Sequence, residues 1–208
     1  MSGLILHYFD VYGRAEMSRQ LLAKAGVEYT DMRYTQEQWV EVKPTMPTQK
    51  IPVLELADGT KMPESADIVR YLGEQYGYWT DNAEEAERLK GLLVEWDSMI
   101  HNSYMPIFAP EEGKAQASVD CWAAWEAFLT KNNDFFGTGH WFNGEKMTSV
   151  DFAFGSLYTG FFLNPIVGHG KEEFAALLVK YPNWKAWGDK YVAELPAGYL
   201  ESQPPRHV

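Results

Sequence analysis

The chain has 208 residues, 46% hydrophobic and 23% charged, which is typical of a globular protein with one large or two small domains. Its net charge of −11, from 18 basic and 29 acidic residues, argues against binding to nucleic acid or to an anionic membrane surface. The single Cys121 excludes an intrachain disulfide and a multi-cysteine zinc site, and without a long apolar run we expect a cytoplasmic protein outside the membrane.

The first 77 residues predict strands that alternate with helices. The β-α-β order at the start implies a parallel strand pair, and Asp58-Gly59 is a strong hairpin signal. Ser65 can cap the helix that follows the hairpin. We expect strands at 4–8, 28–33, 50–56 and from 61, helices at 15–25 and 66–76, and a polar, irregular or short helical piece at 37–43. This order predicts a thioredoxin-like domain over residues 1–77.

From residue 83 onward the apolar residues recur at helical spacing, which predicts an all-helical domain over residues 83–208. Thr148 and Asp151 match a capping box, and Met147 and Phe152 match the hydrophobic staple that accompanies it. We expect helices at 83–108, 114–131, from 149 through 161, 172–180 and 184–194, and a tail at 196–208 against the surface.

Tyr8 lies at the end of the first predicted strand, and Gly13-Arg14 come just before the first helix. A helix N-terminus offers unpaired N–H groups and partial positive charge, so this corner favours an anion such as a thiolate. In so acidic a chain an anionic ligand needs local cations, which Arg14, Lys43 and Lys50 can supply. The competing interpretation is that Tyr8 is an ordinary strand-end residue and Arg14 a surface charge, because strand–turn–helix units are common.

Several short motifs run along nearly the whole chain. They are Tyr8-Phe9, Gly13-Arg14-Ala15-Glu16, Trp39 with Lys43, Lys50-Ile51-Pro52, Glu64-Ser65 followed by Ile68-Val69-Arg70-Tyr71-Leu72, and the Thr148/Asp151 box. In order and spacing they resemble the cytosolic glutathione S-transferases, most of all the sigma class, which includes the glutathione-dependent prostaglandin D synthases. The resemblance implies an α/β N-terminal thioredoxin-like domain plus an all-α C-terminal helical domain.

The resemblance also implies a homodimer with glutathione as co-substrate. Tyr8 would donate a hydrogen bond to the glutathione sulfur, and Arg14 would add positive potential there, so these two are the expected catalytic residues. The expected glutathione-binding residues are Tyr8, Arg14, Trp39, Lys43, Lys50, Ile51, Pro52 (after a cis bond), Glu64, Ser65, and Asp97 from the other subunit.

By matching position, a second-substrate pocket for small hydrophobic electrophiles should include Phe9, Val11, Gly13, Met99, Tyr104, Ala153 and Leu157. Each of these residues could equally be part of the core. Ala153 replaces a bulky aromatic of the prostaglandin enzymes, and Ser98 interrupts an acidic cluster that holds a divalent cation in them, so we expect no metal site here.

The sequence therefore predicts a glutathione transferase that conjugates the thiolate to hydrophobic electrophiles. A glutathione-dependent isomerase of a prostaglandin-type endoperoxide is the second hypothesis. A non-catalytic, crystallin-type binding or structural protein is the third.

Overall fold

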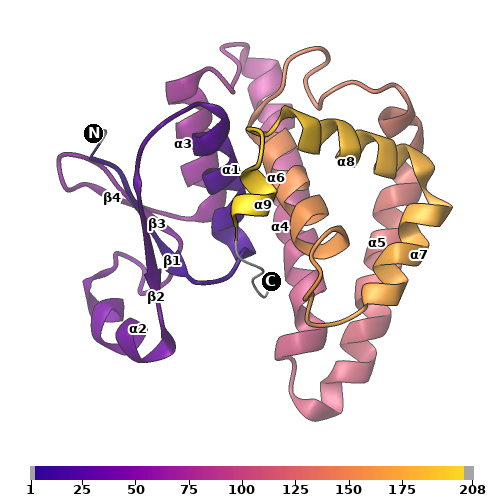
Figure 1. Cartoon of the computed structure of the whole chain (residues 1–208), viewed down its shortest axis with the longest axis horizontal. Coiled ribbons are helices and arrows are strands. Elements are labelled where there is room, and N and C mark those ends of the chain that lie inside the picture. The colour runs from indigo at the N-terminus through magenta and orange to yellow at the C-terminus, as the bar shows by residue number, and fades with distance from the viewer. Residues whose placement is uncertain (1–2, 204–208) are drawn as a thin grey trace.

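The computed structural model describes residues 3–203, and Figure 1 shows a small sheet with its helices beside a larger group of helices. The strands are β1 (Ile5–Phe9), β2 (Thr30–Tyr34), β3 (Val53–Glu55) and β4 (Lys61–Pro63). The helices are α1 (Glu16–Lys24), α2 (Gln36–Val42), α3 (Ser65–Tyr76), α4 (Ala83–Phe108), α5 (Lys114–Gly137), α6 (Ser149–Leu157), α7 (Lys171–Lys180), α8 (Pro182–Glu194) and α9 (Tyr199–Ser202). Single turns are η1 (Gly13–Ala15), η2 (Lys43–Thr45), η3 (Glu111–Gly113) and the π-helical η4 (Tyr158–Phe162).

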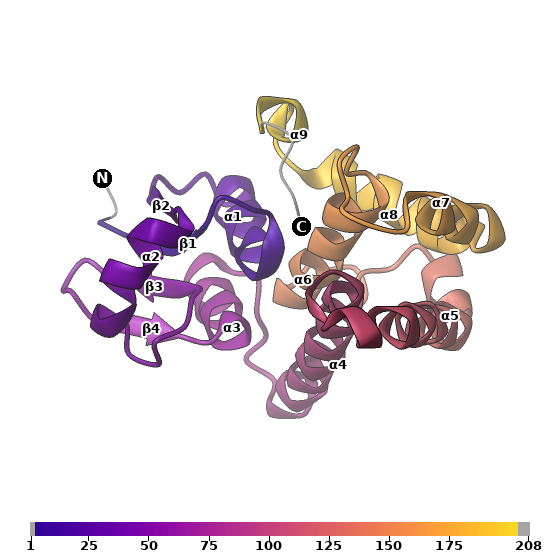
Figure 2. The ribbon, with the colours of Figure 1, turned by 90° about the horizontal axis from the view of Figure 1, so that it is seen from below.

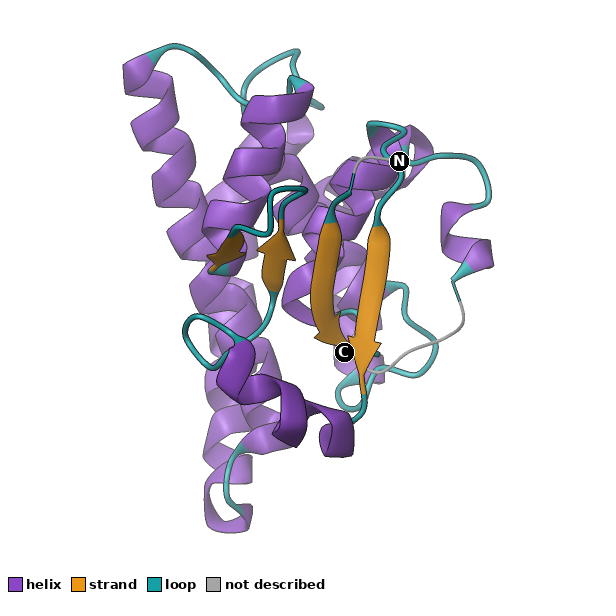
Figure 3. Cartoon of the chain, turned by 90° about the vertical axis from the view of Figure 1, so that its left-hand side faces the viewer, coloured by secondary structure: helices purple, strands orange, loops and turns teal. Residues whose placement is uncertain are grey.

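The sheet has the strand order β2-β1-β3-β4, with β1 parallel to β2 and β3 antiparallel to both of its neighbours. The strand β1 is mostly apolar, and Leu4 just before it and Leu6 within it are buried. Figure 2 shows α1 and α3 between the sheet and the helical part, with α2 on the other side of the sheet. Figure 3 looks onto the strands from the side of α2, with most of the other helices behind them. This arrangement confirms the thioredoxin-like expectation.

The helical part is built around α6, all of whose residues are buried. Helix α6 packs against α1, α4 and α8, and the long helices α4 and α5 lie side by side (Figure 1). One continuous hydrophobic core runs from Leu6 in the sheet through Trp96 to Trp184. Within residues 3–203, no helix combines the length and apolarity that a membrane span requires.

The helical C-terminal part confirms the expected fold class. The division into domains at residues 77 and 83 stays a prediction, although α3 ends at Tyr76 and α4 begins at Ala83. The ends of the two proposed domains, residues 1–2 and 204–208, lie outside the described residues, as does the end of the predicted tail.

Several local expectations differ from the structure. Ser65 is the first residue of α3 and does not cap it; the capping position is taken by Glu64, which has φ +68° and no side-chain capping bond. The third strand is shorter than expected, because Pro52 lacks the N–H that a ladder position needs. Helix α5 extends beyond the expected end at 131 because Phe136 is buried, with its ring 4.9 Å from that of Trp184.

The expected helix through Phe161 instead ends at Leu157 and widens into the π-turn η4. There the Leu163 N–H donates to the carbonyl of Tyr158, five residues earlier, over 3.2 Å. The start of α6 is as expected: Thr148 and Asp151 form the capping box. Helix α9 and the single turns η1 and η3 carry no periodic apolar pattern, so periodicity did not indicate them.

Candidate functional site

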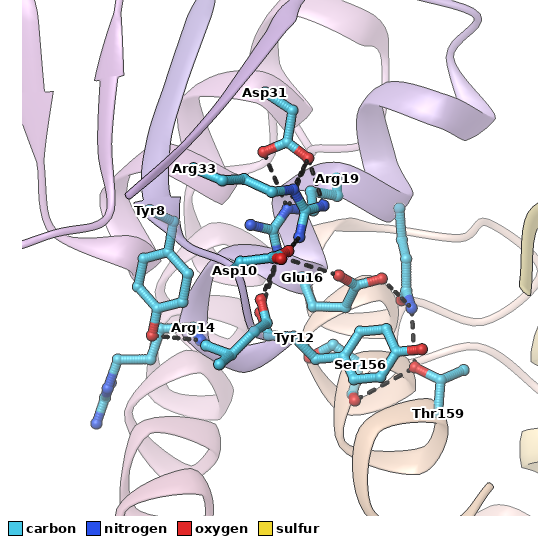
Figure 4. A network of polar contacts seen from close by, with 12 residues as sticks. Tyr8, Asp10, Tyr12, Arg14, Glu16, Arg19, Asp31, Arg33, Ser156 and Thr159 are labelled. Carbon is cyan, nitrogen blue, oxygen red and sulfur yellow. Dashed lines mark hydrogen bonds and ion pairs between the residues drawn. The ribbon is translucent and has the colours of Figure 1, made fainter. Parts of the chain in front are cut away.

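The loop from β1 to α1 brings Tyr8 and Arg14 together. The Tyr8 side chain is 7% exposed, and its hydroxyl oxygen accepts a hydrogen bond from the Arg14 N–H over 3.1 Å (Figure 4). Burial raises the pKa of Tyr8, and the Arg14 N–H and the charges of Arg14 and Arg19 offset part of that rise. The hydroxyl therefore stays protonated near neutral pH, and its proton is available to an acceptor.

Gly13 packs directly on the Tyr8 ring. Its backbone has φ +52°, and a Cβ atom at this position would lie 2.6 Å from both Cε1 and the hydroxyl oxygen of Tyr8. Only glycine permits this close approach, so residue 13 determines where the Tyr8 hydroxyl lies.

Arg14 lies in the turn η1 and reaches from the sheet side to α4. Its guanidinium forms an ion pair with the Asp97 carboxylate of the same chain, and its Cζ atom lies 5.8 Å from the centroid of the Trp96 ring. Because both partners come from α4, the positive charge beside Tyr8 depends on how the helical part docks on the sheet.

Most of the expected glutathione-binding residues line one cavity of about 480 Å³. Its lining residues are Phe9, Arg14, Trp39, Thr48, Gln49, Lys50, Ile51, Pro52, Glu64, Ser65 and Asp97. The bond between Ile51 and Pro52 is cis, as the resemblance implied. Tyr8 is buried and Lys43 is exposed on η2, and neither is among the residues that line this cavity.

The chemistry of this lining suits a short peptide with charged ends. Arg14 and Lys50 offer cations, and Glu64 and Asp97 offer carboxylates for an amino group. Ser65 begins the twelve-residue helix α3, so the partly positive N-terminus of that helix faces the cavity. The volume lies within the usual range for small-molecule sites.

The structure does not bring the seven expected second-substrate residues together in this cavity. Only Phe9 among them lines it, with its ring 5.7 Å from that of Trp39. Ala153, Leu157 and Met99 are buried in the core, at 0%, 1% and 4% exposure.

The remaining three members are Val11, Gly13 and Tyr104. Gly13 packs on Tyr8, and the half-buried Tyr104 contacts Phe108 and Phe161. Val11 is half-buried, and its carbonyl oxygen accepts a hydrogen bond from Arg19. The second-substrate pocket therefore stays a prediction, and the burial of Met99, Ala153 and Leu157 also suits a core role.

Sequence reasoning missed the polar side chains on the buried face of α1. Glu16, Arg19 and Gln20 are each at most 1% exposed. The available signal was their spacing, because positions 16, 19 and 20 share one helix face with the apolar Ala23.

Comparison with known proteins agrees with the geometry. The family model for the N-terminal domain of glutathione S-transferases matches residues 5–74. Glutathione S-transferase P of Caenorhabditis elegans is 32% identical over 205 residues, which are 93% of this chain and 95% of that protein. The chain belongs to the glutathione S-transferase family. Hematopoietic prostaglandin D synthase of Gallus gallus is 31% identical over 206 residues, 96% of either chain.

Two solved structures and a crystallin are also similar to this chain. The prostaglandin synthase D of Nilaparvata lugens superposes with a TM-score of 0.80 at 26% identity, covering 97% of this chain and 98% of that chain. The sigma class GST of Fasciola hepatica shares the fold, with a TM-score of 0.79 at 24% identity over 97% and 96% of the two chains. S-crystallin SL20-1 of Nototodarus sloanii is 36% identical over 114 residues, so the match spans about half of either protein.

These findings confirm the resemblance to the sigma-like enzymes. The chain is a sigma-like glutathione transferase, and glutathione is its co-substrate.

Proposed function

We propose that the Tyr8 hydroxyl stabilises glutathione as a thiolate and that this thiolate attacks hydrophobic electrophiles. The observation that carries the proposal is the buried, protonated Tyr8 hydroxyl, which accepts from the Arg14 N–H and keeps its own proton for donation. A free thiol has a pKa of about 8.5, so a hydrogen-bond donor and a nearby cation favour the thiolate at neutral pH. Glutathione is itself the nucleophile, and the protein stabilises and positions it.

The two ends of glutathione would meet different parts of the cavity. Trp39 and Lys43 would hold the glycyl carboxylate, and the backbone of Ile51, before Pro52 and beside Lys50, would hold the cysteinyl unit. Glu64 and Ser65 would take the γ-glutamyl end, together with Asp97 of the partner subunit. Support comes from the shared cavity, which seven of the nine residues expected from the same chain line: Arg14, Trp39, Lys50, Ile51, Pro52, Glu64 and Ser65.

The electrophiles that we propose are halonitroarenes, activated alkenes and lipid-derived carbonyls. With a halonitroarene, the thiolate sulfur forms a bond to the ring carbon, and the halide leaves with the electron pair of the broken bond. The half-buried aromatic side chains Phe9 and Tyr104 near the catalytic corner suit such flat, apolar partners.

The substitution Tyr8→Phe tests the catalytic proposal. Conjugation of glutathione to chlorodinitrobenzene at pH 6.5 should fall by about tenfold to a hundredfold, because the thiolate loses its hydrogen-bond donor. The apparent pKa in the pH–rate profile should rise toward that of free glutathione, while binding to immobilised glutathione persists. Tyr34→Phe is the matched control, since the Tyr34 hydroxyl pairs with His7 on the neighbouring strand. Wild-type turnover in Tyr8→Phe would remove Tyr8 from the mechanism.

A prostaglandin-type isomerase is the second candidate, and the avian and insect prostaglandin synthases among the relatives favour it. It would use the same thiolate on an endoperoxide, so product analysis with that substrate separates it from conjugation. Binding to immobilised glutathione without conjugation or isomerisation would instead support the crystallin-type protein that the lens relatives suggest.

We also propose a cytoplasmic homodimer. The α3–α4 face offers an interface, because it combines the exposed Val94 with a cavity of about 650 Å³ that residues of both helices line. Asp97 lies on the same face, which suits its proposed contribution to the other subunit's glutathione.

A further inference from the structure

Helix α1 buries a charged side chain where a globular core normally places an apolar one. Arg19 is 1% exposed and lies on the same helix as the fully buried Met17, Leu21 and Leu22. Burial of a guanidinium is costly unless it is paired and hydrogen-bonded, and an apolar side chain of similar volume is often as stable at such a position. The contacts of Arg19 therefore call for a role beyond stability.

Those contacts converge on the end of β1 and the loop that connects it to α1. Arg19 donates to three backbone carbonyl oxygens there, those of Phe9, the last residue of β1 (3.3 Å), and of the loop residues Val11 (2.8 Å) and Tyr12 (3.0 Å). Its charge is balanced by the carboxylates of Glu16 (3.3 Å) and Asp31 (3.2 Å). Its Cζ atom lies 5.7 Å from the centroid of the Tyr8 ring.

The loop that Arg19 holds separates the two partners of the catalytic hydrogen bond. Residues 9–13 connect Tyr8, whose hydroxyl accepts, to Arg14, whose N–H donates. A guanidinium has five N–H donors in a fixed planar fork, so it can hold several carbonyl oxygens at once. The position of the Arg14 N–H relative to the Tyr8 hydroxyl thus depends on Arg19.

Glu16, whose carboxylate balances the charge of Arg19, is connected by hydrogen bonds to the helical part of the molecule (Figure 4). The buried Glu16 carboxylate accepts from the Tyr199 hydroxyl (3.0 Å) and from Gln20 (3.3 Å). Gln20 donates in turn to the Thr159 hydroxyl (2.8 Å) and accepts from the Tyr191 hydroxyl (2.6 Å). The network therefore connects the loop beside Tyr8 to η4, α8 and α9.

We propose that Arg19 is a positioning residue for thiolate activation, which holds the β1–α1 loop so that Arg14 and Tyr8 meet. The proposal rests on the role of Tyr8 proposed above, and Arg19 itself does not touch glutathione. Its essential property is the multi-donor fork, and charge alone is not sufficient.

Arg19→Lys tests this directly, because lysine keeps the positive charge and loses the planar fork. At pH 6.5 we expect kcat for chlorodinitrobenzene conjugation to fall at least about tenfold, with KM for glutathione within about threefold. The thiolate absorbance of bound glutathione, titrated against pH, should give a thiol pKa higher than that of the wild type. Amide exchange at Arg14 should accelerate, because its N–H loses the Tyr8 acceptor.

Arg33→Lys is the matched control. Arg33 also pairs with Asp31, and it reaches the loop through the side-chain carboxylate of Asp10, whereas Arg19 reaches it through backbone carbonyls. It should leave kcat and the thiol pKa near their wild-type values. Equal effects of the two lysine variants would mean that the Asp31 pair matters and the carbonyl contacts do not, which overturns the proposal.

Three further outcomes test the proposed role of Arg19. A folded Arg19→Lys variant with wild-type kcat, thiol pKa and Arg14 exchange overturns the proposal while leaving the role of Tyr8 intact. If Arg19→Lys does not fold, Arg19→Gln, which also loses the five-donor fork and leaves Asp31 in place, should raise the thiol pKa in the same direction; an unchanged value there overturns the proposal. A wild-type chain that shows no thiolate activation refutes the proposed role of Tyr8 itself.

Discussion

Tyr8 and Gly13 lie so close together that a side chain at residue 13 would collide with the Tyr8 ring, and neither residue alone accounts for the position of the hydroxyl. The ring fills the space that a side chain at residue 13 would need, and the positive φ of Gly13 allows the next residue to turn its N–H toward the Tyr8 oxygen. Adding a single methyl group at residue 13 should therefore displace the Tyr8 hydroxyl, although Gly13 itself has no side chain that could take part in the reaction.

The substitution Gly13→Ala should lower kcat for conjugation at least about tenfold, because the new Cβ displaces the Tyr8 hydroxyl. Gly26→Ala is the matched control: Gly26 has a similar φ of +67°, and a Cβ there meets no atom within 4 Å. Both variants should lose roughly 1–2 kcal/mol of stability through the unfavourable backbone conformation. Steady-state kinetics measures kcat, and urea unfolding measures the stability of both variants. Equal kcat values for Gly13→Ala and Gly26→Ala would contradict the role of Gly13 in placing the Tyr8 hydroxyl.

At the scale of single residues, the sequence indicated the residues that we propose to contact glutathione more readily than the residues that support them. Tyr8, Arg14, Trp39 and Lys50 occur in motifs with fixed spacing, which a reader of the sequence can match. Arg19 occurs in no such motif, and an arginine in an amphipathic helix is usually a solvated surface residue. Its role follows only from the loop carbonyls that the fold brings to it.

Among the helices, α6 shows that local sequence signals can predict where a helix begins without predicting where it ends. The Asp151 carboxylate accepts from the N–H (2.7 Å) and hydroxyl (3.0 Å) of Thr148 and from the Phe142 N–H (2.9 Å). This capping box is encoded within four residues, so the sequence predicted the start of α6. The π-turn at its end depends on tertiary packing around η4, for which no local code exists.

Asp151→Ala should destabilise the protein by about 1–3 kcal/mol, because two buried N–H donors lose their acceptor. Catalytic turnover of the folded variant should stay near wild type, since α6 contributes packing to the site and no reacting group. Gln38→Ala in the exposed capping box of α2 is the control and should cost less. Thermal unfolding checks this, and an unchanged melting temperature in Asp151→Ala would refute the role of the cap.

The same carboxylate should give stability an unusual pH dependence. Burial raises the pKa of Asp151 from 3.8 to about 6, despite its hydrogen bonds. The folded state then holds more protons than the unfolded state between these values, so this contribution to stability falls as pH rises. Between pH 5 and pH 7 the stability difference between wild type and Asp151→Ala should shrink by about 1 kcal/mol. Urea unfolding of both proteins at the two pH values measures it, and a difference that grows with pH would contradict the raised pKa.

Across the whole molecule, the fold class followed from the sequence because each half has its own periodicity, alternating in the sheet and helical afterwards. How the halves dock could not be predicted in that way, since the shared core and the polar network from Glu16 to Tyr199 join residues far apart in the chain. The second-substrate residues stay a prediction for the same reason: position matching grouped Ala153 and Leu157 with Phe9, whereas in the structure the first two are buried and Phe9 lines the cavity.

The proposed dimer has to bring together two subunits that each carry a net charge of −11, so apolar contact at the α3–α4 face must outweigh their repulsion. Val94, 68% exposed on α4, is the apolar side chain available there. Val94→Asp should therefore shift sedimentation toward the monomer, and high salt should partly restore the dimer by screening the added charge.

Val179→Asp is the matched control for the dimer test, because Val179 is 84% exposed on the distant helix α7 and should leave the oligomeric state unchanged. The glutathione site supplies a second readout. If Asp97 of the partner subunit helps to hold the amino group of glutathione, the Val94→Asp monomer should show a raised KM for glutathione, whereas the control should not. A dimer that persists in Val94→Asp with an unchanged KM would mean that the α3–α4 face is not the interface. A monomer with an unchanged KM would mean that each subunit binds glutathione with its own residues alone.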